Sequence, residues 1–270
     1  MSIRKLFSTI FGMVMLSALV VRANAQLTEQ AASEQARNTV RSQLNLRPDQ
    51  YLGVQRDETL EQSLALAVGR SAGSEFIYRL SPTGYELKEN AIVHHFTVDG
   101  DYVYIIAISP MDGTTYRISG FADSLAEFAK LMTAVGEKVS SPDQAESLAD
   151  FYRRVNPENH EDLNPILRLL ELKQAAERQC QSGAKSFGAG EQAFTAWWDH
   201  AKPLYAEISF KQTATPSSGG YLVEWIVLSS AAKGNCGGVP LRARLEVSSD
   251  GRVLKITFSP LQKGRVARPS

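Results

Sequence analysis

The sequence predicts an α+β fold made of two antiparallel β-meanders, each packed with helices. Alternation of period two, typical of strands, and periodicity of 3.6, typical of helices, occupy separate stretches, and each half of the chain contains both. The clearest strand signal is 92–121, where Asp99-Gly100 and Asp112-Gly113 mark turns between three apolar runs. The middle run, 102–108, is apolar on both faces, which predicts a central strand.

Residues 1–25 resemble a secretory signal peptide. Arg4 and Lys5 precede the apolar stretch 6–21, and Ala23-Asn24-Ala25 fits a small-x-small cleavage site. Cleavage after Ala25 would leave an exported soluble chain, periplasmic or extracellular, without stable membrane insertion. That chain would keep 26 of the 29 basic residues and all 29 acidic ones, a balance that indicates no nucleic-acid partner.

The remaining chain divides at the polar run 156–162, whose proline interrupts a helical pattern. We predict a flexible or weakly helical segment over 26–46, a first α+β domain over 47–160, a second over 161–260 and a disordered tail over 261–270. A loop within one domain is the alternative interpretation of 156–162.

Capping signals place the elements of the first domain. Asp57 or Thr59 begins a helix that Gly69 ends. Strands over 75–80 and 85–88 precede the meander, and helices beginning at Ser124 and Ser141 follow it.

The second domain begins with a helix over 164–180 and a short helix that ends before Pro203, and four strands follow. We predict strands over 204–212, 221–229, 241–247 and 253–258. Leu254, Ile256 and Phe258 of the last strand should face a core, and Arg242, Arg244 and Lys255 should face solvent. The long helix should pack across the apolar face that contains Ile208, Leu245 and Ile256. This helix on a curved sheet resembles the layout of cystatin-like and nuclear-transport-factor-like modules, by analogy of layout alone.

Cys180 and Cys236 are the two cysteines, the even count expected of an exported chain, and we predict that they form a disulfide. The pairing would bring the end of the long helix to the loop before the third strand. Without a third cysteine the pair favours a structural role, so no metal or cofactor is predicted.

Two patterns raise the alternative of an extracellular or periplasmic hydrolase. Gly69-Arg70-Ser71-Ala72-Gly73 matches G-x-S-x-G, but a helix precedes it and a strand follows, the reverse of a nucleophile elbow. A His and carboxylate cluster could gather His160, Glu161, Asp199 and His200 across the domain boundary. His94 and His95 are adjacent on a strand, so they point to opposite faces and cannot bind one metal together.

Five aromatic residues of the second domain form the densest aromatic group and are candidates for lining a ligand pocket: Trp197, Trp198, Tyr205, Tyr221 and Trp225. Core packing is the competing interpretation. Residues 201–270 also contain 10 basic and 4 acidic residues, a basic bias that fits either a binding face or a solvated one.

No coherent catalytic set emerges from these patterns. The sequence therefore favours an exported structural or ligand-binding protein without evident catalysis, whose partner is a small ligand or another protein. A third hypothesis, an assembly or inhibitor protein, would require an exposed apolar patch or an open sheet edge, near Tyr221 or Tyr102.

Overall fold

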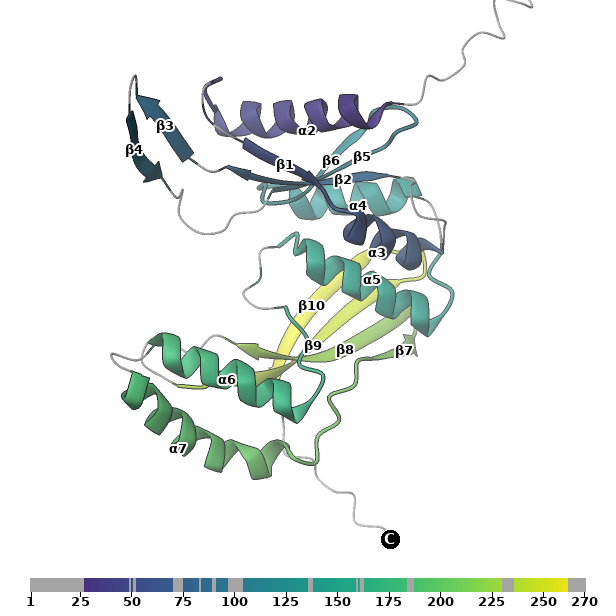
Figure 1. Cartoon of the computed structure of the whole chain (residues 1–270). Coiled ribbons are helices and arrows are strands. Elements are labelled where there is room, and N and C mark those ends of the chain that lie inside the picture. The colour runs from purple at the N-terminus through teal and green to yellow at the C-terminus, as the bar shows by residue number, and fades with distance from the viewer. Residues whose placement is uncertain are drawn as a thin grey trace, which may run out of the picture.

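A computed structural model shows the predicted α+β fold. Its description covers residues 27–48, 50, 52–69, 75–82, 84–88, 91–96, 104–135, 138–158, 160, 163–183, 187–229 and 236–261. These residues form six helices, two four-stranded antiparallel sheets and one two-stranded sheet (Figure 1). The signal-peptide prediction, Ser71 and the Asp99-Gly100 turn lie outside the described residues.

The first half contributes six strands and four helices in this described part. The strands are β1 (Leu52–Arg56), β2 (Phe76–Pro82), β3 (Gly84–Lys88), β4 (Ala91–Phe96), β5 (Tyr104–Ile108) and β6 (Thr115–Ser119). The helices are α2 (Glu29–Leu44), α3 (Glu58–Val68), α4 (Ser124–Val135) and α5 (Pro142–Val155). Asp57 caps α3, Gly69 ends it at φ 70°, and Ser141 caps α5, as predicted.

The first sheet has the strand order β1-β2-β5-β6, so β5 is a central strand as its sequence predicted. Ile106 and Ile108 of β5 pack toward α2, whereas Ile105 and Ala107 pack toward α3 and α4 on the opposite face. Both faces of this sheet are therefore buried by helices.

The predicted three-stranded meander over 92–121 is wrong in its first pairing. β4 pairs with β3 in the separate two-stranded sheet, and β2 takes the place beside β5. The residue pattern explains the exchange. Ile77 and Tyr78 are adjacent in β2 and both are buried, one on each face, whereas the sequence of β4 contains two adjacent histidines, which are costly to bury on both faces of a central strand.

Helix α2 covers the first sheet through a stripe of small residues. Ala32, Ala36 and Val40 are spaced four apart, so they lie on one face of the helix, and all three are buried. Small side chains bring the helix axis close to the sheet. The sparse large apolar residues of this segment led us to expect only a weakly amphipathic helix.

The second half contains α6 (Leu169–Gly183), α7 (Phe187–Tyr205) and a sheet of order β10-β9-β8-β7. Its strands are β7 (Thr213–Ser217), β8 (Gly220–Ser229), β9 (Val239–Ser248) and β10 (Val253–Pro260). The predicted strand over 204–212 is wrong, because α7 continues through Pro203 to Tyr205 and the first strand begins at Thr213.

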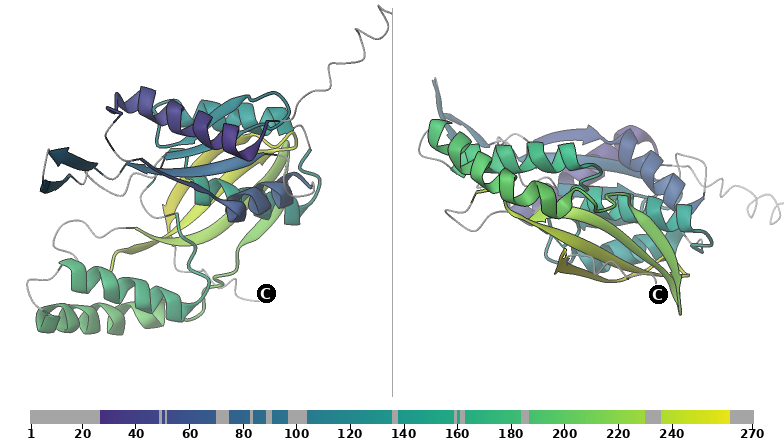
Figure 2. Two further views of the ribbon diagram at one scale, coloured as in Figure 1. Left: turned by 45° about the horizontal axis from the view of Figure 1, so that its top comes forward. Right: turned by 90° about the horizontal axis from the view of Figure 1, so that it is seen from below.

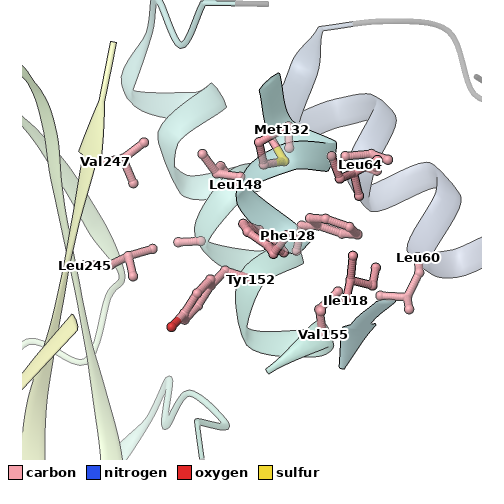
Figure 3. Packing of buried hydrophobic residues seen from close by; sticks show 14 of the residues in the cluster. Leu60, Leu64, Ile118, Phe128, Met132, Leu148, Tyr152, Val155, Leu245 and Val247 are labelled. Atoms are coloured by element: carbon pink, nitrogen blue, oxygen red, sulfur yellow. The ribbon is translucent and has the colours of Figure 1, made fainter. Parts of the chain in front are cut away.

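Helix α5 lies between the two sheets and joins them in one hydrophobic cluster. Figure 3 shows Leu148 and Tyr152 of α5 between Leu64 of α3 and Leu245 of β9. The layers thus follow in the order α2, first sheet, α3 with α4, α5, second sheet, and α6 with α7 (Figures 1 and 2). The boundary near residue 160 stays a prediction, but this cluster extends across it.

The face of the second sheet that α6 covers differs from the predicted one. Leu245 and Ile256 lie on the face toward α5, the inner face. Helix α6 instead packs its Leu172 and Ala176 with Ile226 and Leu228, on the outer face. Strand β8 is apolar on both faces at this end, so either face could accept a helix, and α5 occupies the inner one.

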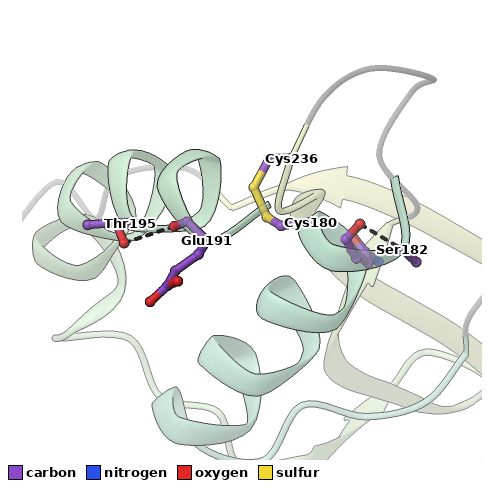
Figure 4. The surroundings of a disulfide bond; sticks show 6 residues. Cys180, Ser182, Glu191, Thr195 and Cys236 are labelled. Carbon is purple, nitrogen blue, oxygen red and sulfur yellow. Dashed lines mark hydrogen bonds between the residues drawn. A yellow bond between two sulfur atoms is a disulfide. The ribbon is translucent and has the colours of Figure 1, made fainter. Parts of the chain in front are cut away.

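The predicted pairing of the two cysteines agrees with the structure. The Cα atoms of Cys180 and Cys236 are 4.5 Å apart, and the sulfur atoms join the end of α6 to the segment entering β9 (Figure 4). Gly237 follows at φ 86°, with the ring of Trp197 packed where a Cβ would be. The disulfide and this contact hold α6, α7 and β9 together at one end of the sheet.

Candidate functional site

The outer face of the second sheet is only partly covered by α6 and presents a charged group beyond it. Alternation along β9 places Arg242 and Arg244 on this face, because their neighbours Ala243 and Leu245 are buried on the inner face. Strand register places Glu224 of β8 opposite Arg244 on the same face. We call Glu224, Arg242 and Arg244 the arginine cluster.

Glu224 positions both arginines of the cluster. Nε of Arg244 donates a hydrogen bond of 2.7 Å to Oε1 of Glu224, and Nη1 of Arg242 lies 3.8 Å from Oε2. The arginine side chains are 39% and 49% exposed for Arg242 and Arg244 respectively, whereas Glu224 is 20% exposed. Since Arg244 uses its Nε, its terminal amino groups make no hydrogen bond to another described residue.

The arginines line a hollow of about 410 Å³ together with Ser259 and Pro260. Its position follows from the register of β9 with β10, in which Arg244 lies opposite Thr257 and Arg242 opposite Ser259. The volume is in the range of small-ligand sites. Two arginines and one serine therefore line a space that an oxyanion could enter.

The chemistry of this group favours binding of oxyanions. Guanidinium is planar and always charged, and its paired N–H donors match the oxygens of carboxylates, phosphates and sulfates. Glu224 neutralises one of the two positive charges, so the cluster keeps a net charge of +1. The basic bias of residues 201–270 reinforces this potential.

A second hollow of about 550 Å³ is lined by residues 55–59 and Arg79. Arg56, Asp57 and Arg79 of this lining are committed to the fold. Arg79 contacts Asp57, whose other oxygen caps α3 through the amide of Leu60. Arg56 pairs with Glu29 and with the buried Glu61. The larger hollow is therefore a seam between α3, β1 and β2.

The five candidate pocket aromatics are not brought together. Trp197, Trp198 and Tyr205 belong to the cluster around α6 on the outer side of the second sheet, and Trp197 and Trp198 stack at 6.1 Å between ring centroids. Trp225 and Tyr221 lie on the inner face with α5. The sheet itself separates the two groups.

The candidate His and carboxylate cluster is described only in part. His160 contacts Glu158, and its ring lies 5.5 Å from that of Phe258, whereas Asp199 and His200 are exposed on α7. Glu161 and Ser71 lie outside the described residues, as do the side chains of His94 and His95. The part of the chain that the structure describes contains no group of three or more metal-ligating side chains.

From the sequence, Arg242 and Arg244 were predicted only as outward-facing residues of a solvated strand. The available signal was the spacing: two arginines at i and i+2 share one face of a strand, and a single glutamate stands alone within the apolar run of β8. Only the register of β8 with β9 shows that these residues meet.

Comparisons of the chain with protein-family models, with curated proteins and with solved structures find no match. Among the described residues, no helix is long and apolar enough to span a membrane.

Proposed function

We propose that this protein is an exported, non-catalytic binding protein that holds an anionic ligand on the outer face of its second sheet. The observation that carries the proposal is the arginine cluster, in which Glu224 positions Arg242 and Arg244 at the hollow. Arginine stays protonated, so it binds anions well and serves poorly as a general base. A hollow lined by two arginines, a serine and a proline is thus suited to recognition.

Export is supported by the signal-peptide pattern of residues 1–25 and by the cysteine pair at disulfide distance, a feature typical of oxidising compartments. Mass spectrometry of the exported protein should find Gln26 at the N-terminus. A mature chain that keeps Met1 would contradict this part of the proposal.

The ligand proposal can be tested with two small oxyanions, citrate and inorganic pyrophosphate. We expect both to shift the NMR signals of the arginine Nε–H groups of Arg242 and Arg244 in a saturable manner. The double variant R242Q/R244Q should lower the affinity at least about tenfold, because both charge-assisted donors are removed.

The matched control is K202Q/R252Q, which removes the same charge from exposed positions of the same half. Its affinity should stay within about twofold of the parent protein, since distant exposed charges are screened. No saturable shift, or an equal loss in both double variants, would show that the arginine cluster is a solvated surface.

A further inference from the structure

Strand β10 is the longest edge strand of the two four-stranded sheets. It has eight residues, whereas the other edges, β1, β6 and β7, have five each. Edge β7 is blocked, because Pro216 cannot donate a ladder hydrogen bond and the amide of Ala214 donates to Glu146 of α5. Within the described residues no strand pairs with the edge of β10 that points away from β9.

The ends of β10 restrict where another strand could pair. A register shift between Val253 and Lys255 interrupts the ladder at one end, and Pro260 lacks an amide proton at the other. The register of β10 with β9 is regular between them. The open edge is therefore Ile256–Ser259, directly beside the hollow of the arginine cluster.

The two faces beside this open edge have different chemistry. On the outer face lie Thr257 and Ser259, opposite Arg244 and Arg242. On the inner face Ile256 packs against the cluster around α5, whereas the ring of Phe258 stays partly exposed beside it. Leu254 and Phe258 were predicted to face a core, but they are 59% and 37% exposed.

The apolar surface on the inner face beside this edge is held in place by contacts within the protein. The ring of Phe258 lies edge-on to His160, which two hydrogen bonds with the side chain of Asn156 hold in place. Asn156 is the C-cap of α5, so the position of Phe258 is tied to that helix. An added strand would meet an ordered apolar surface on one side and, on the other, the two arginines that pair with Glu224.

We propose that the anionic ligand is an extended polypeptide segment that pairs with Ile256–Ser259 as a fifth strand. Successive side chains of a strand point to opposite faces, so the matching segment alternates acidic residues, toward Arg242 and Arg244, with apolar residues, toward Phe258. Main-chain hydrogen bonds to β10 provide affinity, and the two unlike faces provide specificity. This inference rests on the proposed function.

The test uses a fluorescein-labelled octapeptide of alternating glutamate and valine, titrated with the full mature chain. One control peptide has the same composition in block order, with all of its glutamates before all of its valines, and another is the alternating peptide N-methylated at every peptide bond. The N-methylated peptide loses two or more backbone hydrogen bonds, and the block-order peptide loses the alternation of acidic and apolar side chains. We therefore expect the alternating peptide to bind at least about tenfold tighter than either control. Hydrogen exchange should slow at Ile256–Ser259 in the complex.

The arginine variants separate the two levels of the proposal. R242Q/R244Q should weaken binding of the alternating peptide about tenfold, while K202Q/R252Q should not. If all three peptides bind equally and lose affinity in R242Q/R244Q, strand pairing is wrong but the anion-binding function stands. If the alternating peptide binds without any need for the arginines, the proposed function fails. Heparin binding tighter than the alternating peptide, with the same dependence on the arginines, would identify a polysaccharide ligand and overturn the inference.

Discussion

Glu61 is a buried carboxylate whose hydrogen-bond partners come from two strands. Its oxygens accept hydrogen bonds from Nε and Nη2 of Arg56 at the end of β1, and from the amide of Ile77 in β2. The residue itself belongs to α3 and is 6% exposed. Glu29 at the start of α2 completes the network through Arg56. The side chain of Arg56 thus links the helices on opposite faces of the first sheet.

We expect Glu61→Gln to lower the free energy of unfolding by about 2 to 4 kcal/mol, because it leaves Arg56 without its main counter-charge in a partly buried position. Urea denaturation measures the change. The control Arg168→Gln breaks the exposed pair with Glu171 and should stay within about 0.5 kcal/mol of the parent. Equal effects of the two substitutions would show that the Glu61 network adds no stability.

Tyr78, which bonds to the same network, makes the stability of the protein depend on pH. Burial, reinforced by the charge of Glu29, raises the pKa of Tyr78 to about 12, and its hydroxyl donates a 3.0 Å hydrogen bond to the carbonyl of Glu29. An unfolded tyrosine ionises near pH 10, at about its ordinary pKa. Between these values the unfolded chain releases a proton that the folded chain keeps. The contribution of Tyr78 to the free energy of unfolding should therefore be fully present below pH 10 and fall as the pH rises toward 12.

We expect Tyr78→Phe to be less stable than the parent at pH 8, where the lost hydrogen bond costs about 1 kcal/mol, and this difference to shrink above pH 10. Urea midpoints at pH 8, 10 and 11 provide the measurement. Burial also raises the pKa values of Tyr116, Tyr152 and Tyr205, but both proteins contain these residues, so the comparison isolates Tyr78. A difference that stays constant with pH would contradict the assignment.

At the scale of single elements, α6 is held to the second sheet by two independent means. Leu172 and Ala176 are buried against Ile226 and Leu228, and Cys180 is joined to Cys236 across a separation of 56 residues. Gln179 adds a weak hydrogen bond of 3.4 Å to the carbonyl of Ser229. The apolar contacts do not depend on the covalent link.

Reduction, or the double substitution C180S/C236S, should therefore lower the free energy of unfolding by up to about 4 kcal/mol in the chain-entropy model without abolishing the fold. Denaturation of oxidised and reduced protein gives the loss, and far-UV circular dichroism of the reduced protein shows whether the helices persist. Non-reducing peptide mapping checks the pairing itself. Free thiols at both positions in exported protein would refute it.

For the whole molecule, α5 is the central layer. Its residues Leu148, Phe151 and Tyr152 are fully buried between α3 and α4 on one side and the second sheet on the other. Phe128 of α4 stacks on Phe151 at 5.7 Å between ring centroids and meets Tyr152 edge-on at 5.6 Å. Such packing couples the two halves, because neither can lose α5 without exposing its own apolar face.

We expect the two halves to unfold together, and Leu64→Ala provides the test. Leu64 is 1% exposed on α3, far from the second sheet in sequence, and its truncation should cost about 2 to 5 kcal/mol. All three tryptophans, Trp197, Trp198 and Trp225, lie in the second half, so tryptophan fluorescence reports on that half and, through Trp225, on its contact with α5. Coupled halves predict equal shifts of the fluorescence and circular dichroism transitions.

The matched control on the same helix is Leu66→Ala, because Leu66 is 68% exposed and its loss should change stability by no more than about 0.5 kcal/mol. A fluorescence transition that does not move in Leu64→Ala, while part of the circular dichroism transition does, would show that the predicted domains 47–160 and 161–260 are independent.

The sequence by itself determined the features that depend on neighbouring residues. Asp57 and Gly69 delimit α3 and Ser141 starts α5, because a cap forms bonds within one turn of its own helix. Alternation located β8, β9 and β10, and the two cysteines allowed only one intramolecular pairing. Export and the domain boundary remain predictions from the same sequence.

Only the tertiary structure decided which elements meet. Strand pairing is a contact between residues distant in sequence, so the turn signals around β4 and β5 did not determine that β2 would lie beside β5. Strand β8 is apolar on both faces at the end that α6 covers, so its alternation could not assign α5 to one face and α6 to the other. The arginine cluster has the same origin. Arg242 and Arg244 acquire a shared partner because the register of β8 with β9 sets Glu224 opposite Arg244, a relation that exists only once the sheet has formed.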